Sequence, residues 1–389
     1  MDIGKLKSLI AGEVDARYNE LRAISRTLHD NPEIAFEETR SSARLVRFLE
    51  SNGFTVETGI CKLPTAFRAV YGAGQPQIAF LAEYDALPKV GHACGHNLIG
   101  TASAAAGVAA RRAADELGGS IVVFGTPGEE LYGGKAIMTE RGAFTDVDFA
   151  MITHPGGGNN VVMNTLACET LEVEFFGKAA HAAGEPEKGI NALEAMIQSF
   201  NGINSLRQHV PEKSRIHGVI TDGGEAANIV PAHTAGMFIV RSENDDLLEN
   251  LKKRVIACFT GAARATGARL KYNWGEHYAA MRSNLTMARL FKQNMEAVGH
   301  PIRLGDNTLQ TFSTDVGNVS RLVPAIQPLV SIAPDDIQLH TPGFAKAAAT
   351  EEALGCMLDA ARAMAMTAVD ILADPDTAVK VREEFRKSG

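Results

Sequence analysis

The sequence has few cysteines and few aromatic residues. Its five cysteines are scattered along the chain, and none belongs to a CxxC pair: Cys61, Cys94, Cys168, Cys258 and Cys356. An odd number without regular spacing argues against a disulfide framework and fits a reducing compartment. Aromatic residues make up 6% of the chain, and Trp274 is its single tryptophan. The composition therefore gives no hint of the shape of a substrate pocket.

Long apolar runs and long basic runs are also missing. No window approaches the roughly 18 apolar residues of a transmembrane helix. Residues 1–7 begin an amphipathic helix pattern and not the apolar core of a signal peptide. The longest basic run is residues 252–254, and the formal net charge is −8. We therefore expect a soluble, cytoplasmic protein whose partners include neither nucleic acid nor membranes.

What the chain does contain is an alternation of helix and strand patterns. Its 389 residues, with 45% hydrophobic content, favour two domains. Residues 5–30 and 344–372 are each predicted to form one long helix. Strands are predicted near five ranges, with helices among them: 55–57, 66–71, 78–82, 121–124 and 149–153. This order predicts an α/β domain with a mixed, mostly parallel sheet flanked by helices.

The pattern changes at about residue 167. Residues 169–176 alternate between apolar and polar side chains, which is typical of a half-exposed strand. The segments that follow complete a βαββαβ order, as in a sandwich of one sheet and two helices. We therefore predict a ferredoxin-like α+β sandwich inserted at 167–278. The α/β domain would then be built from residues 1–166 and 279–389.

Three predicted strands end in side chains that can bind metals. The first is followed by Cys94 and His96, the next by Glu129 and Glu130, and the third by His154. Since the carboxyl ends of parallel strands line one crevice, we expect these side chains to converge. Cys94 also precedes a predicted helix, whose positive end should lower the pKa of the thiol and favour the thiolate.

His340 is a fifth candidate ligand and completes a set of thiolate, imidazole and carboxylate groups. The set comprises Cys94, His96, Glu130, His154 and His340. Such donors suit zinc, and manganese, cobalt or nickel are alternatives. Five ligands are too many for one tetrahedral catalytic site, but with one of them bridging they fit two ions. Glu129 is then left to act as the general base.

Each of these motifs also has a structural explanation. A lone cysteine is most often a small buried residue, and a lone histidine is most often a hydrogen-bonded surface group. A Glu-Glu pair is most often a solvated turn. The placement of the motifs at three strand ends favours the metal-binding interpretation. His92, by contrast, is predicted to be structural or to support a ligand.

The combined motifs resemble the M20 metallopeptidases. They read Asp85-Ala-Leu-Pro, His92-Ala-Cys-Gly-His, Gly128-Glu-Glu, His154-Pro and His340-Thr-Pro. They are most similar to the amidohydrolase subfamily. The wording Cys-Gly-His-Asn-Leu-Ile is closest to the branch of peptidase M20 domain-containing protein 2, whose animal members are dipeptidases. The resemblance covers nearly the whole chain and implies a catalytic domain like that of metallo-aminopeptidases and carboxypeptidases.

The resemblance implies a role for each matching residue. Two divalent metal ions, zinc or manganese, would be bound by the five candidate ligands, with Glu129 as the general base. Asp85 would orient a ligand, and His181 would stabilise the oxyanion. Three further residues would bind the substrate: Asn228, Arg241 and Gly343.

Two positions depart from the subfamily. Asn97 and Glu83 stand where many members carry aspartate. Neither is among the predicted ligands, but both could change the metal preference.

The resemblance further implies a hydrolase that acts on amide bonds. Its substrate would be a small N-acyl amino acid or a dipeptide with a free C-terminal carboxylate. The chain would form a homodimer through the inserted domain. Two alternatives stay open, a strict dipeptidase for one particular C-terminal residue and a catalytically inactive binding protein that keeps the fold. Four further points stay open: the accepted acyl group and amino acid, the native metal, whether the protein is a dimer or a tetramer, and whether His181 acts across the dimer.

Overall fold

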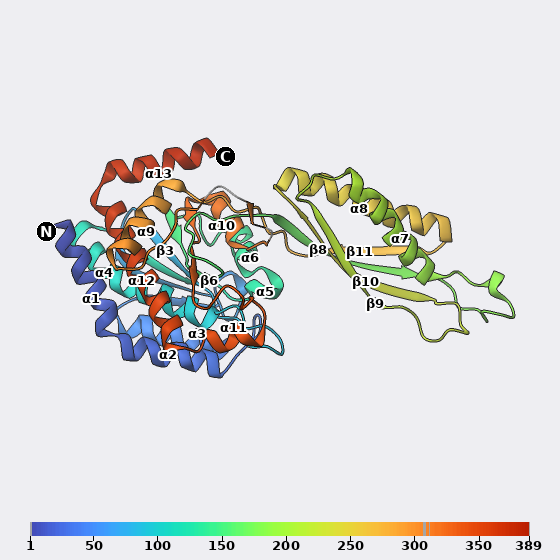
Figure 1. Cartoon of the computed structure of the whole chain (residues 1–389), viewed down its shortest axis with the longest axis horizontal. Helices are drawn as coiled ribbons and strands as arrows, with labels where there is room; N and C mark the ends of the chain where they lie inside the picture. Colours follow the sequence, from blue (N-terminus) through green and yellow to red (C-terminus); the bar gives the residue numbers. More distant parts are fainter. Residues whose placement is uncertain (1, 306–308, 311, 389) are drawn as a thin grey trace. The chain divides into compact units, whose positions relative to one another are not determined.

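The computed structural model describes residues 2–305, 309–310 and 312–388 and divides into two compact units (Figure 1). Unit 1 comprises Met1–Asn164, Met281–Leu309 and Thr314–Gly389, and unit 2 comprises Thr165–Ala280 and Gln310–Ser313. The limits of the inserted domain that the sequence predicts, residues 167 and 278, stay a proposal. Two short strands, β7 (Asn164–Thr165) and β12 (Leu309–Gln310), lie where the chain passes from one unit to the other. Within the described residues, no helix is both long and apolar enough to cross a membrane.

A six-stranded mixed sheet forms the centre of unit 1. In spatial order its strands are β1 (Thr55–Thr58), β2 (Phe67–Ala73), β4 (Gly119–Gly125), β3 (Gln77–Ala82), β5 (Phe149–Met151) and β13 (Ala325–Ile326). Strands β4, β3, β5 and β13 run parallel, whereas the pairings of β1 with β2 and of β2 with β4 are antiparallel. The sheet is therefore mixed and mostly parallel, as predicted. The three strands that precede the candidate ligands lie side by side in it.

Helices cover this sheet and bury its apolar side chains. They are α1 (Ile3–Ala16), α2 (Tyr18–Asp30), α3 (Thr39–Ser51), α4 (His96–Leu117), α5 (Glu129–Tyr132), α6 (Gly134–Glu140), α9 (Leu285–Ala297), α10 (Val316–Leu322), α11 (Pro342–Ala347), α12 (Glu351–Ala373) and α13 (Pro375–Ser388). Helix α4 is buried on nearly all sides, because it packs on β3 and β4 and also contacts α1 and α12. A helix that is buried all round has no polar face, and α4 is accordingly rich in alanine.

Two long helices expected from the sequence are each divided in the structure. The segment 5–30 turns at Arg17, so that α1 packs on α12 and α4 while α2 packs on α3 and α4. The segment 344–372 is divided between α11 and α12, because the hydroxyl of Thr350 accepts a hydrogen bond from the N–H of Ala353 and begins a new helix. Both single-helix predictions were therefore wrong. Tertiary packing interrupts the first apolar pattern, and a helix cap interrupts the second.

Unit 2 is an antiparallel sheet with two helices on one face (Figure 1). In spatial order its strands are β11 (Arg269–Trp274), β8 (Ala167–Phe176), β10 (His233–Ser242) and β9 (Arg215–Asp222), and its helices are α7 (Ala192–Leu206) and α8 (Asp245–Thr266). Alternate side chains of β8, such as Val173 and Phe175, are buried in one core with Phe259 of α8. This is the inserted α+β sandwich that the alternation of residues 169–176 predicts.

Candidate active site

The carboxyl ends of three neighbouring strands lead to the candidate ligands. Strand β3 leads to Cys94 and His96, β4 leads to Glu129 and Glu130 on α5, and β5 leads to the short strand β6 (His154–Gly156). Strand β6 pairs in parallel with β14 (Leu329–Ser331). Because β4, β3 and β5 are parallel neighbours, their ends meet at one edge of the sheet.

These side chains and His340 form one cluster of possible metal ligands within unit 1. The ligand atoms of Cys94, His96 and His154 all lie within 4.8 Å of one another. A second group at the same spacing combines Cys94 with Glu130 and His340. A third group at this spacing combines His96 with Glu129 and Glu130, so Cys94, His96 and Glu130 each belong to two groups. The structure thus brings together all five residues that the sequence singles out as metal ligands.

The residues of the cluster fit divalent cations. Two buried ligand atoms, His96 Nε2 and Glu130 Oε1, have no hydrogen-bond partner among the described residues. Such atoms are rare in folded proteins and indicate a group that binds there. Glu130 Oε1 lies 3.4 Å from Nε2 of His340 and 3.9 Å from Nε2 of His96. Donors on one tetrahedral zinc lie about 3.4 Å apart, because the bonds to zinc are about 2.0–2.2 Å long.

Asp85 lies behind the cluster and contacts two of its members. Its Oδ1 accepts a hydrogen bond from Nδ1 of His96 at 3.0 Å, and its Oδ2 accepts one from the backbone N–H of Glu130 at 3.0 Å. The first contact directs Nε2 of His96 into the cluster, and the second fixes the start of α5. Nδ1 of His154 donates in the same way to the carbonyl oxygen of Pro155. Both imidazoles therefore present Nε2 as the ligand atom.

Gly95 allows two segments of the cluster to pack closely. Its φ of 81° lies in the region that favours glycine. A Cβ atom at this position would lie 2.8 Å from Cγ of Pro155, which follows His154. A larger residue between Cys94 and His96 would therefore push the segment after β3 away from β6.

The two adjacent glutamates of α5 differ in their electrostatic surroundings. Burial and, next, the charge of Glu83 raise the pKa of Glu129 well above its ordinary value. Burial acts on Glu130 in the same direction, but His340 and His96 outweigh it and lower the pKa of Glu130. Neighbouring carboxyl groups with opposite pKa shifts suit different tasks. Glu130 is suited to bind a cation, and Glu129 is suited to carry a proton.

Cys94 does not have the lowered pKa that its place before α4 predicts. Before any ion binds, burial raises the pKa of its thiol well above the ordinary value, and the charge of Glu130 adds to this effect. The start of a helix does not compensate for the loss of water around a buried sulfur. A bound cation would instead supply the stabilisation of the thiolate.

A buried lysine beside the cluster was not predicted. Lys135 lies in the first turn of α6, and its Nζ is 2.7 Å from Oε1 of Glu83 and 2.6 Å from Oδ1 of Asp315. Burial alone lowers the pKa of Lys135, but the charges of Asp315 and Glu83 outweigh it and raise the pKa, so the amine is an ammonium ion. Glu83 directly follows β3, so its place at the strand end could have marked it. Nothing in the local sequence marks Lys135.

Glu38 supports the cluster from outside and was also not predicted. It is buried, and its carboxylate accepts hydrogen bonds from the N–H of Gly128 at 2.9 Å and from the hydroxyl of Thr65 at 2.8 Å. Burial and the charge of Asp85 raise the pKa of Glu38 to about 7. Because Gly128 directly precedes α5, this contact fixes the segment that carries Glu129 and Glu130.

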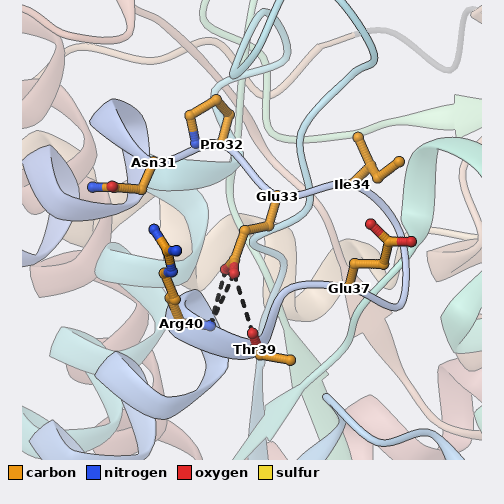
Figure 2. Close-up of a pocket in the computed structure, with 7 residues that line it drawn as sticks. All are labelled: Asn31, Pro32, Glu33, Ile34, Glu37, Thr39 and Arg40. Carbon is orange, nitrogen blue, oxygen red and sulfur yellow. Dashed lines mark hydrogen bonds between the residues drawn. The ribbon is translucent and has the colours of Figure 1, made fainter.

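A surface pocket of about 380 Å³ lies on the segment before α3 (Figure 2). Its lining comprises Asn31, Pro32, Glu33, Ile34, Glu37, Thr39 and Arg40. The carboxylate of Glu33 accepts hydrogen bonds from the hydroxyl of Thr39 and the N–H groups of Arg40 and Ser41, so it caps α3. None of the candidate ligands lines this pocket, and the oxygens of Glu33 already have partners. We therefore do not assign it to the active site.

Two residues of the Cys-Gly-His segment face away from the cluster. The amide of Asn97 donates to Oγ of Ser25 at 3.1 Å and to the carbonyl oxygen of Ala348 at 3.0 Å. Nε2 of His92 lies 3.1 Å from the carbonyl oxygen of Leu28, and burial lowers the pKa of His92 to about 3. Both residues join the start of α4 to other segments of unit 1.

The remaining predicted site residues lie on other segments. Three belong to unit 2 and one to α11 of unit 1: His181, Asn228, Arg241 and Gly343. Nδ1 of His181 accepts hydrogen bonds from the N–H groups of Ala183 and Gly184 at 3.2 and 3.0 Å. This leaves the proton on Nε2, which can donate. The guanidinium of Arg241 donates to Oγ of Ser313 at 3.0 Å.

Comparisons with known proteins agree with these features. Residues 169–266 match the family described as the peptidase dimerisation domain. The chain is 36% identical to the Xaa-Arg dipeptidase of Mus musculus, over 98% of this chain and 92% of the relative. It is 34% identical to the Xaa-Arg dipeptidase of Homo sapiens, over 99% of this chain and 93% of the relative. A p-aminobenzoyl-glutamate hydrolase protein from Escherichia coli (strain K12) is 34% identical, over 74% of this chain and 64% of the relative.

Solved structures share the fold at lower identity. The aminobenzoyl-glutamate utilization protein from Klebsiella pneumoniae has a TM-score of 0.72 and 20% identity, over 92% of this chain and 97% of that chain. The YXEP protein of Bacillus subtilis, described as a dinuclear metal binding peptidase from the M20 family, has a TM-score of 0.69 and 20% identity, over 92% of this chain and 99% of that chain. Since the dipeptidases are similar over nearly the full length, the chain belongs to the M20 family of metallo-hydrolases, which act on peptide and amide bonds.

Proposed function

We propose that this chain hydrolyses the amide bond of a small substrate whose leaving amino acid carries a free carboxylate. The observation that carries the proposal is the cluster of unit 1, where unpartnered buried ligand atoms lie beside two glutamates with opposite pKa shifts. Similarity to two Xaa-Arg dipeptidases favours a dipeptide with a basic C-terminal residue. Similarity to an aminobenzoyl-glutamate hydrolase supports N-acyl amino acids as a second class of substrate.

The proposed cofactor is a pair of divalent cations, zinc or manganese. Its ligands would be Cys94, His96, Glu130, His154 and His340. When bound, the cations would lower the pKa of a water molecule and polarise the scissile carbonyl group. The spacing of the ligand atoms within these groups supports this assignment.

Glu129 is the proposed general base. Its carboxylate would accept a proton from the attacking water and then donate it to the leaving amine. The raised pKa of Glu129, caused first by its burial, favours the form that carries the proton, which Glu129 must hold before the amine leaves. Asp85 would keep His96 and Glu130 in place through the two hydrogen bonds of its carboxylate.

Unit 2 is proposed to supply contacts to the substrate. The guanidinium of Arg241 suits a carboxylate, because its two N–H edges match both oxygens. Nε2–H of His181 is a donor for the developing oxyanion, and its protonation is supported by the backbone N–H groups that bind Nδ1. Asn228 and Gly343 complete the proposed set of substrate-binding residues.

We also propose a homodimer through the inserted domain, and a cytoplasmic location. The match of residues 169–266 to a peptidase dimerisation domain supports the dimer. The scattered, odd cysteines support a reducing compartment.

One substrate panel tests the proposed function. Purified protein is incubated, with and without a chelator, with dipeptides ending in basic, acidic or apolar residues and with N-acetyl, N-aroyl and fatty-acyl amino acids. Release of the amino acid is followed by mass spectrometry, and Glu129→Gln is the control variant. We expect release from dipeptides with a basic C-terminal residue, inhibition by the chelator and no release by the variant.

Other outcomes separate the alternatives. Release from N-acyl amino acids alone would replace the dipeptidase by a deacylase within the same mechanism. No release from any substrate by protein that binds two ions per chain would favour a binding protein that keeps the fold. Absence of both release and bound ions would overturn the ligand assignment.

A further inference from the structure

Lys135 is placed unusually for a charged residue. No other lysine or arginine of the described residues is fully buried. Its ammonium bridges Glu83, the residue after β3, and Asp315, the residue before α10. Asp315 also accepts the backbone N–H of Lys135 at 2.8 Å through its second oxygen. The lysine is thus fixed at both its backbone and its side chain.

Stability alone does not account for such a bridge. Removing an ammonium and two carboxylates from water is expensive, and their mutual attraction in the interior rarely gives a net gain. Apolar side chains of similar size often stabilise a protein as well or better. A charge at this place therefore calls for a role in the neighbouring cluster.

Glu83 connects the bridge to the cluster. Its Oε1 lies 2.7 Å from Nζ of Lys135, whereas its Oε2 lies 3.5 Å from Nε2 of His96. This spacing is close to the roughly 3.4 Å between two donors on one tetrahedral zinc. Yet Glu83 does not belong to any of the groups of three ligand atoms within 4.8 Å. One of its oxygens is thus at the margin of the cluster, and the other is held by an ammonium ion.

We propose that Lys135 is a positioning residue that holds Glu83 beside the metal centre and out of coordination. A catalytic metal site needs a coordination position for water or substrate. A carboxylate at ligand spacing would occupy that position unless a competing cation held it back. The ammonium of Lys135 is that competing cation, and Asp315 fixes it. This inference rests on the proposed function, because it assigns a task at the same site.

Four variants test the inference in the full chain: Lys135→Met, Glu83→Gln, the double variant Lys135→Met/Glu83→Gln, and Lys252→Met as the matched control. Lys252 of unit 2 also bridges two carboxylates, at 2.6 and 2.7 Å. Each protein is loaded with cobalt as the probe ion. The metal readouts are the absorption spectrum of the cobalt, the number of bound ions and the rate of cobalt loss to a chelator. The kinetic readouts are kcat and KM for the best substrate of the panel.

Removal of Lys135 should free Glu83 to bind the ion, and each readout should then change in a definite direction. We expect Lys135→Met to alter the cobalt spectrum, to slow cobalt loss by about tenfold and to lower kcat by about 10–100-fold with KM changed by less than about threefold. The double variant should regain the original spectrum and most of kcat. Lys252→Met should match the unchanged protein in every readout. If the bridge were only structural, Lys135→Met should lose cobalt faster than the unchanged protein, because its metal site would be less rigid.

Three results would overturn the inference. They are faster cobalt loss from folded Lys135→Met, an unchanged cobalt spectrum in it, and loss of one bound ion from Glu83→Gln alone, which would make Glu83 a ligand. Should Lys135→Met not fold, the double variant replaces it: faster cobalt loss from the double variant than from the unchanged protein would then overturn the inference. If the unchanged protein binds cobalt and hydrolyses nothing, the proposed function fails, and the spectrum and the rate of cobalt loss still decide the role of Lys135.

Discussion

Two lysines of this protein each bridge two carboxylates, and they differ in their surroundings. Nζ of Lys252 lies 2.6 Å from Glu169 and 2.7 Å from Glu249 in unit 2, nearly the same distances that Lys135 has to its partners in unit 1. The side chains of Lys252 and Glu249 are 15% and 52% exposed, whereas Lys135 and both its partners are fully buried. The two bridges therefore contribute differently to stability although their distances are equal, because only the buried ammonium depends entirely on its protein partners.

The same contrast applies to the groups of possible metal ligands. Glu169, Glu249 and His277 of unit 2 are spaced as closely as the ligands in unit 1. Each of these three residues, however, already has hydrogen-bond partners. Nδ1 of His277 lies 3.3 Å from Glu169, its Nε2 lies 3.0 Å from Asp245, and Lys252 contacts both glutamates. Close spacing alone thus does not distinguish a metal centre from a charge network. Burial adds a distinction, because Cys94, His96 and His154 are all buried, whereas Glu249 is exposed.

The largest effect should come from Glu129. Replacing it with glutamine removes the proposed base and should lower kcat by about 10²–10⁴-fold while two ions stay bound. Glu249→Gln, which changes a glutamate of the unit 2 group, should leave both quantities unchanged. Steady-state hydrolysis and metal analysis of the two variants make the test. Activity of Glu129→Gln within tenfold of the unchanged protein would refute the assignment.

Removal of each bridging lysine should differ in its effect on stability. In metal-free protein, Lys135→Met leaves two buried carboxylates unpaired and should lower the free energy of unfolding by about 3–5 kcal/mol. Lys252→Met should lower it by about 1 kcal/mol or less, because water reaches Glu249 and His277 still faces Glu169. Urea unfolding can be followed by circular dichroism, and by the fluorescence of Trp274 for unit 2. Equal losses in the two variants would show that burial is not the deciding difference.

A smaller effect is expected for Asn97, a buried polar residue whose Nδ2 has two hydrogen-bond partners while its Oδ1 has none among the described residues. Asn97→Asp removes the donors to Ser25 and Ala348 and places a carboxylate against a carbonyl oxygen. We expect a loss of about 1–3 kcal/mol in the free energy of unfolding, with an unchanged preference between zinc and manganese. Competition between the two ions, measured on the variant, checks the second part. A changed preference would make Asn97 part of the metal centre.

The smallest effect should be a pH dependence of unit 2. Hydrogen bonds from His277 to Asp245 and Glu169 raise the pKa of His277 to about 9, from an ordinary value of 6.5. The folded state therefore binds this proton more tightly, so its stabilisation is complete below about pH 6.5 and disappears as the pH rises through about 9. Since His277 is about a third exposed, screening should keep the effect below about 1 kcal/mol. Unfolding of His277→Gln, followed through Trp274, should lack this pH dependence.

The sequence reveals those parts of the site that follow from local patterns. Apolar strands followed by Cys94, Glu130 and His154 predict a convergence of ligands, because parallel strands place their carboxyl ends at one edge. The motif context also predicts Asp85 near the ligands. The sequence also contains a signal for the division at Thr350, since a threonine followed by two glutamates is a common helix start.

Other parts depend on contacts between distant segments. Lys135 follows two glycines in a short helix and is indistinguishable from a surface lysine until Glu83 and Asp315 are brought to it. The break at Arg17 lacks proline and glycine and arises from the packing of two helices on different neighbours. The place of Cys94 before a helix predicts a lowered pKa of its thiol, but burial, which the sequence does not state, raises that pKa.

The proposed ligands come from segments far apart in the sequence, and they meet only after the sheet has formed. An ion would therefore bind the folded chain and not the unfolded one. Each tenfold rise of free ion above its dissociation constant would then add about 1.4 kcal/mol per ion to the stability of the folded state. Because a cell degrades unfolded chains, the abundance of this protein would follow the supply of its metal as well as its rate of synthesis.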